Sequence, residues 1–188
     1  MSLLPSRNHR HNKAMPLPER LINGQSLGDI SRMKFGLSTI SYSGCEVIAV
    51  YNALLLAGKP QPFPDIARYM ERFRVLGGFW GTNFLALGRC LRRFGLPAKW
   101  VRRRAKLLAG LEAGRICLMV YWTGRRFLSP VHTVCIRRSG AETVAVYNQY
   151  NNCDRVLDEP TEQFLAKRLI VGYVTDAGET SFFCEKKQ

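Results

Sequence analysis

The stretch SYSGCEVIAVYNALLLAG, residues 41–58, decides the fold because it predicts a helix that is apolar on nearly every face. Ser43 and Glu46 have the spacing of a capping box, in which each side chain accepts a hydrogen bond from a main-chain N–H that the first turn leaves unpaired. Gly58 and Pro60 end the helix. We therefore expect a buried helix that begins at Ser43.

Cys45 lies in the first turn of this predicted helix. The unpaired N–H groups and the positive end of the helix dipole favour an anion there, so a cysteine can have a lowered pKa and become a nucleophilic thiolate. The other interpretation is a small buried apolar side chain, which is what most free cysteines are. Taken alone, the stretch favours this second interpretation.

Length and composition indicate one domain with a proper core. The chain has 188 residues, of which 46% are hydrophobic, and no apolar run approaches the ~20 residues that span a bilayer. The first twenty residues are polar, interrupted by prolines and without the apolar centre of a secretory signal. We expect a mobile basic arm over residues 1–30, one domain over residues 31–188, and a cytoplasmic protein without a membrane segment.

The six cysteines form no C-x-x-C pair. They are Cys45, Cys90, Cys117, Cys135, Cys153 and Cys184. Neither a zinc site nor a disulfide framework is indicated, and reduced thiols in a reducing compartment fit best. We expect no metal and no cofactor.

The net charge of +14 raises the question of a nucleic-acid partner. Residues 89–106 hold eight basic residues and no acidic one. Arg89, Arg92 and Arg93 have the helical spacing of a solvated face opposite an apolar stripe. There is no dedicated nucleic-acid motif and no aromatic stacking set beside the arginines. We therefore expect no specific nucleic-acid binding.

The order of the predicted elements indicates an α+β fold, with helices first and an antiparallel sheet afterwards. Further helices are expected within residues 59–73, from Thr82 or Asn83 to Gly95, and at 105–114 and 161–167. Strands are expected at residues 99–103, 115–121, 131–137, 142–148 and 168–174. Residues 131–137 and 142–148 form a hairpin around the turn RSGAE.

His132 is the one histidine inside predicted structure, because His9 and His11 fall in the N-terminal arm. A nucleophilic cysteine needs such a base to take its proton. With the turn near Ser139 and Gly140, positions that sum to about 280 face each other, so Asn148 lies across from His132. Cys45, His132 and Asn148 thus match the nucleophile, base and orienting residue of a catalytic triad.

The order of these segments resembles the papain-like cysteine peptidases of the C39 and C39-like group. It comprises SGCEVIAVYNALLLAG, then GGFWGTNFLALGRCLRRFGL, then VHTVCIRR and VAVYNQYNN, over about residues 36–175. The resemblance implies a papain-like fold, with a helical part packed on a C-terminal antiparallel sheet. It also implies Cys45 as nucleophile, His132 as general base and Asn148 as orienting residue.

Two positions differ from that group. The residue after the cysteine is Glu46 where glycine is common. No glutamine precedes the cysteine by about six residues, so Thr39 and Ser38 are the candidates for stabilising an oxyanion. A missing donor of this kind lowers the rate by roughly 100- to 1,000-fold in other hydrolases.

The leading hypothesis is a thiol hydrolase that cleaves a peptide or other amide, and the same triad would support acyl transfer to an amine. The alternative is a catalytically weak or inactive module on the same scaffold. In that case the aromatic pair Phe79 and Trp80, in the glycine-rich loop 75–83, would line a groove that holds a peptide.

Overall fold

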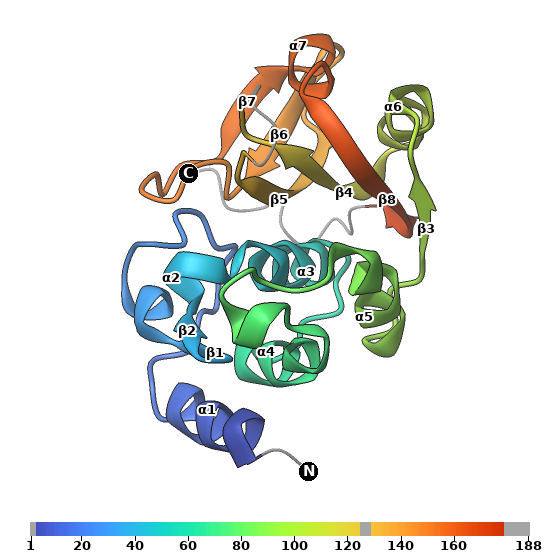
Figure 1. The fold of residues 1–188 in the computed structure, drawn as a ribbon. Coiled ribbons are helices and arrows are strands. Elements are labelled where there is room, and N and C mark those ends of the chain that lie inside the picture. Colours follow the sequence, from blue (N-terminus) through green and yellow to red (C-terminus); the bar gives the residue numbers. More distant parts are fainter. Residues whose placement is uncertain (1–2, 125–128, 179–188) are drawn as a thin grey trace.

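The protein is described by a computed structural model that covers residues 3–124 and 129–178, so Cys184 lies outside the described residues. A helical part and a six-stranded antiparallel sheet lie one above the other, with helix α3 between them (Figure 1). One apolar core joins α3 to one face of the sheet. A second, smaller core lies on the opposite face of the sheet, under α6 and α7. The α+β fold expected from the sequence is confirmed.

Helix α3, Cys45–Leu56, is buried at every position, as the sequence predicts. It begins after Gly44, however, and no side chain caps it. Ser43 ends the short helix α2, Ile40–Ser43, and its hydroxyl donates a hydrogen bond to the main-chain carbonyl of Thr39. The predicted capping box is therefore wrong, because Ser43 already belongs to the preceding helix.

The remaining helices mostly follow the prediction. The helical part contains α4, Phe63–Met70, and α5, Leu87–Arg93, while α6, Arg104–Glu112, and α7, Thr161–Leu165, accompany the sheet. Short 3-10 helices lie at Asp29–Arg32, Glu71–Phe73, Leu76–Gly78 and Phe84–Ala86. Asn83 caps the last of these, since its side chain accepts a hydrogen bond from the N–H of Leu85.

The sheet has the strand order β3-β8-β4-β5-β6-β7, and all neighbours are antiparallel. Its strands are β3, Ala98–Val101; β4, Arg115–Trp122; β5, Val131–Arg138; β6, Thr143–Tyr147; β7, Leu157–Pro160; and β8, Arg168–Gly178. A separate hairpin joins β1, Lys34–Phe35, to β2, Ser38–Thr39. The sequence predicted five of the six strands of the large sheet and missed β7, in which only alternate residues are half-buried.

The β5–β6 hairpin has a different register from the predicted one. Cys135 pairs with Tyr147 and Arg138 with Val144, so facing positions sum to 282. The loop is centred one residue later than expected, and Ser139 still donates its N–H to the carbonyl of Thr143. Asn148 therefore follows the last paired residue of β6 and does not lie directly across from His132.

The N-terminal segment is a helix where the sequence predicted a mobile arm. Helix α1, Leu3–Lys13, packs on α4 and on the β1–β2 hairpin. The buried amide of Asn8 donates one hydrogen bond to the carbonyl of Gly36 and one to the carboxylate of Glu71, and each has a length of 2.7 Å. Asn12 exchanges two hydrogen bonds with the main chain of Lys34. Hydrogen bonds from asparagine amides hold this helix against the rest of the protein. The apolar pattern of the sequence therefore did not predict that the helix packs there.

The basic face predicted for α5 is present. Arg89, Arg92 and Arg93 are exposed, while Leu87 and Leu91 are fully buried. Arg89 and Arg93 stack over the rings of Phe73 and Tyr69.

Within the described part of the chain, every helix is too short or too polar to cross a bilayer.

Candidate active site

Cys45 is the first residue of α3, and its thiol contacts the residue that follows it. The sulfur donates a hydrogen bond to Oε2 of Glu46 over 3.3 Å. Both side chains are almost completely buried, with 7% of Cys45 and 5% of Glu46 exposed. The helix thus begins with a thiol and a carboxyl group that are hydrogen-bonded to each other inside the protein.

Burial opposes the charged form of both groups. It raises the pKa of the Cys45 thiol well above its usual value, and the Glu46 carboxyl raises it further. Burial also raises the pKa of Glu46 to about 7, against the smaller effect of the N–H groups that face its oxygens. The lowered thiol pKa that a helix N-terminus can produce is therefore absent here, because desolvation is the larger effect.

A glycine turn holds the Glu46 carboxyl in place. The main-chain N–H of Thr82 faces it and lowers its pKa against the larger effect of burial. Gly81 has φ +66, and a Cβ at this position would lie 2.8 Å from Oε2 of Glu46. Only glycine allows both the left-handed backbone and the close approach. The loop therefore fits against the carboxyl.

The start of β5 lies directly against the Cys45 sulfur. The main-chain N–H of Thr133 faces the sulfur and lowers the thiol pKa, but burial has the larger effect. Thr133 shares its sheet face with Cys135, which packs in the core around α3. Thr133 is fully buried, and the sequence had not marked it as a site residue.

His132, the preceding residue, is next to this contact along the chain, but its ring is turned to other partners. Nε2 is 2.7 Å from the main-chain oxygen of Asn148. The ring meets Tyr121 edge-on, with 6.0 Å between the ring centroids. Burial lowers the pKa of His132, partly offset by the Asn148 contact. The hydrogen bonds of the described residues include none between Cys45 and His132.

Asn148 is in contact with His132 through its main chain, while its side chain has a different role. Its φ is 62, a left-handed conformation that asparagine tolerates better than most residues. Oδ1 accepts the N–H of Gln25 over 3.1 Å, and Nδ2 donates to Oε1 of Gln25 over 3.2 Å. The Gln25 amide also donates to the carbonyl of Ser41. Gln25 therefore joins the end of β6 to α2, and no sequence pattern predicted this role.

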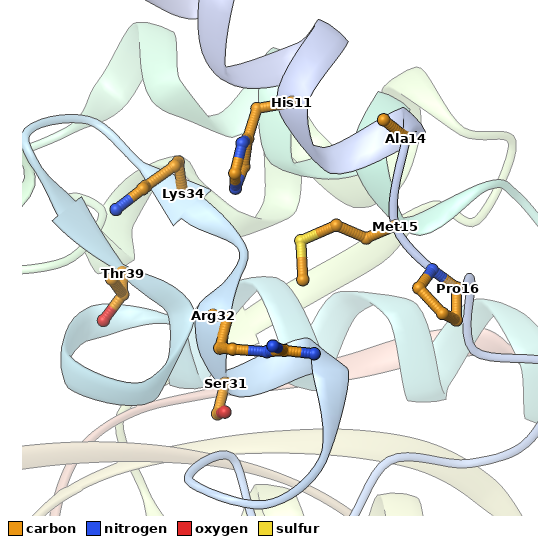
Figure 2. A pocket seen from close by; sticks show the side chains of 8 residues that line it. All are labelled: His11, Ala14, Met15, Pro16, Ser31, Arg32, Lys34 and Thr39. Carbon is orange, nitrogen blue, oxygen red and sulfur yellow. The ribbon is translucent and has the colours of Figure 1, made fainter.

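The two oxyanion candidates, Thr39 and Ser38, lie in the β1–β2 hairpin. Ser38 pairs with Phe35, and Thr39 pairs with Lys34. Thr39 lines a cavity of about 580 Å³ beside α1, opposite His11 and Met15 (Figure 2). The groups that the structure places against the Cys45 sulfur are instead Glu46 and Thr133.

Phe79 and Trp80, the groove candidates, are exposed by 50% and 69%. They precede Gly81 and Thr82, which contact the Glu46 carboxyl. The aromatic pair therefore lies on the same loop as Gly81 and Thr82, the residues that face the Glu46 carboxyl.

Among the residues that the structure describes, no three His, Cys, Asp or Glu side chains form a group that could hold a metal ion.

No family model matches the chain, and no curated protein matches it in sequence. Solved structures that are similar to it include two peptidase domains. The peptidase domain of Streptococcus ComA, a bifunctional ABC transporter of a quorum-sensing pathway, has a TM-score of 0.54 at 12% identity, over 72% of this chain and 91% of that one. A double-glycine-motif protease from an AMS/PCAT transporter, solved with its leader peptide, has a TM-score of 0.49 at 17% identity. This match covers 70% of this chain and 82% of that one.

The fold is accordingly that of C39 papain-like peptidase domains, as the sequence resemblance implied.

Proposed function

We propose that this protein is a thiol hydrolase that cleaves a peptide or other amide bond through Cys45, with His132 as its acid–base group. The observation that supports this most directly is the peptidase-domain fold, in which the buried helix that begins at Cys45 packs against β5, the strand that carries His132. A thiol at the start of a buried helix meets the start of a strand that carries a histidine. The shared fold of a peptidase domain favours a peptide as the substrate.

His132 is suited to proton transfer because burial keeps its imidazole neutral. The carbonyl of Asn148 accepts a hydrogen bond from Nε2, so the proton lies on Nε2 and the lone pair on Nδ1. Asn148 is thus the orienting residue through its main-chain oxygen. The amide side chain supports that oxygen indirectly, by holding the backbone of residue 148 against Gln25.

The raised pKa of Cys45 has a consequence for the resting enzyme. The thiol is protonated at neutral pH, so the reaction begins from S–H and requires proton transfer during attack. The sulfur forms a thioester with the acyl group of the substrate, the amine leaves with a proton, and water hydrolyses the thioester. Such an enzyme is slower than one with a preformed thiolate.

The test is hydrolysis of a peptide library by the wild-type protein and by Cys45→Ala. We expect Cys45→Ala to lose at least about 1,000-fold in kcat/KM, as removal of a nucleophile does. Cys153→Ala is the matched control, because Cys153 is a free and partly exposed thiol elsewhere in the chain. Hydrolysis that survives in Cys45→Ala would overturn the proposal.

The second candidate is a peptide-binding module without catalysis. The neutral, buried thiol of Cys45 favours it, since a vestigial site needs no thiolate. In this case wild-type protein and Cys45→Ala bind the same peptides with equal Kd, and neither cleaves them.

A further inference from the structure

Glu46 is the acid–base group that already has a hydrogen bond with the Cys45 thiol. The S–H donates to Oε2, and the main-chain N–H of Thr82 faces the carboxyl and favours its charged form. Gly81 packs against both carboxyl oxygens and leaves no room for a Cβ. An apolar residue would pack better at this position than a buried glutamate does, so packing does not explain why Glu46 is held here.

We propose that Glu46 accepts the proton of the Cys45 thiol during nucleophilic attack, and that His132 acts only in the later steps. The proposal rests on the proposed function, since it concerns the nucleophile of that reaction. It adds a second acid–base residue, one that the sequence comparison marked only as a departure from glycine.

Geometry favours Glu46 over His132 for this first transfer. The thiol–carboxyl hydrogen bond is formed in the resting protein, whereas the His132 ring is held by the Asn148 carbonyl and lies against Tyr121. Basicity points in the same direction. Burial raises the pKa of Glu46 to about 7 and lowers that of His132, so transfer of the thiol proton to the carboxylate is the less unfavourable of the two.

The proton inventory balances with water as the only co-reactant. The S–H bond breaks as the C–S bond forms, and Oε2 of Glu46 gains the proton. The protonated Glu46 then gives this proton to the departing amine and is a carboxylate again. His132, neutral at rest, takes a proton from the attacking water and gives it to the sulfur as the thioester breaks, so the site ends as it began.

Among the described residues, Tyr121 interacts with the Cys45 thiol from the sheet, and the loop 75–83 contributes the main-chain N–H of Thr82. His132 lies edge-on to Tyr121, and Lys167 lowers the pKa of its ring. A titration near pH 7 at the sulfur therefore has Glu46 as its source and His132 as the competing one.

The test is the pH dependence of Cys45 alkylation by iodoacetamide, followed by mass spectrometry of the Cys45 peptide from pH 5 to pH 10. A thiol that shares its proton with a carboxylate reacts through the S⁻/COOH form, whose population rises as the carboxyl loses its own proton. We expect a step in the rate near pH 7 and a second rise at higher pH, where the thiol ionises. Glu46→Gln should lack the first step.

His132→Gln and Glu112→Gln are the control variants, since Glu112 is an exposed residue of α6. The proposal expects both to keep the step. A step that persists in Glu46→Gln, or disappears in His132→Gln, would overturn it, as would a wild-type profile without a step. If Glu46→Gln does not fold, the wild type and His132→Gln still decide between the two bases. Alkylation needs no substrate, so an absent step rejects Glu46 alone, whereas hydrolysis by Cys45→Ala rejects the proposed function.

Discussion

The two sides of the candidate site are built from different chemistry. On the helix side, Cys45 and Glu46 are both ionisable, buried and joined to each other. On the sheet side, His132 is held by a main-chain carbonyl, and Asn148 is held by the neutral amide of Gln25. The Glu46 carboxyl changes charge near pH 7, whereas burial lowers the pKa of His132 and keeps that ring neutral there. Around and above neutral pH, therefore, the helix side responds to pH and the sheet side keeps its geometry.

The largest expected effect is on the helix side, in the pH dependence of stability. The pKa of Glu46 is about 7 in the folded protein and near 4.5 when the chain is unfolded, so the folded state binds the proton more tightly. The contribution of Glu46 to the free energy of unfolding is fully present below pH 4.5 and is lost as the pH rises to 7. The shift corresponds to about 3 kcal/mol. We expect Glu46→Gln to equal wild type near pH 4.5 and to exceed it by up to about 3 kcal/mol at pH 8.

Urea unfolding at pH 4.5, 6 and 8 measures this difference. His132 acts in the opposite direction, because its pKa is lowered in the folded state and stability falls as the pH drops through about 6.5. That effect is common to both proteins and cancels in their difference. A constant difference between Glu46→Gln and wild type across this range would remove the contrast between the two sides.

The support of the carboxyl gives the next effect. Gly81→Ala places a Cβ 2.8 Å from Oε2 of Glu46 and forces a non-glycine residue to φ +66. We expect a loss of about 2 kcal/mol in the free energy of unfolding. Gly95→Ala is the matched control, because Gly95 has φ +78 and a Cβ there would have no neighbour within 4 Å. Equal losses for both variants would show that the contact with Glu46 has no energetic weight.

On the sheet side we expect a smaller effect. Asn148→Gly accommodates the left-handed backbone and keeps the carbonyl that His132 contacts, but it loses both side-chain bonds to Gln25. The expected loss is about 1 kcal/mol, and Asn148→Ala should lose roughly 1 kcal/mol more. If the carbonyl orients His132, kcat for Asn148→Gly stays within about threefold of wild type. A drop of more than tenfold would assign the orienting role to the amide.

The smallest effect on stability is expected at Trp80, which is mostly exposed. Trp80→Ala should change the free energy of unfolding by less than about 0.5 kcal/mol. If the loop 75–83 lines the substrate groove, KM rises several-fold in peptide hydrolysis. Trp100→Ala, at an exposed position of β3, is the matched control and should leave KM unchanged. An unchanged KM in Trp80→Ala places the groove elsewhere.

Much of the fold could be predicted because apolar periodicity reports burial. The continuous apolar run of α3, the alternation in β5 and β6 and the apolar run of β4 each had one consistent interpretation. Helix α1 and strand β7 were missed because neither is held by apolar contacts that a pattern reveals. Asn8 and Asn12 dock α1 through hydrogen bonds to distant main-chain groups, which no local pattern encodes.

The sequence singled out Cys45, His132 and Asn148 as candidates, but it did not reveal the contacts that each of them makes. Position at a helix start indicated Cys45, but the direction of its pKa depends on burial and on Glu46, and both follow from tertiary packing. The predicted register of the β5–β6 hairpin was wrong by two residues, because the loop is centred one residue later than expected. Asn148 therefore contacts His132 through its main-chain carbonyl and not through its side chain. Thr133 and Gln25 had no signal, since a threonine in a strand and a glutamine in a loop are ordinary residues.

The hydrogen bonds between Gln25 and Asn148 have a consequence for the order in which the chain folds. The two residues are 123 positions apart. During synthesis at ~5–20 residues per second, Gln25 waits about 6–25 s before Asn148 exists. Contacts of such sequence separation form late, because a long loop must close before they are made. We therefore expect the segment from Ile22 to Gln25 to be protected from hydrogen exchange last during refolding, after the sheet is complete.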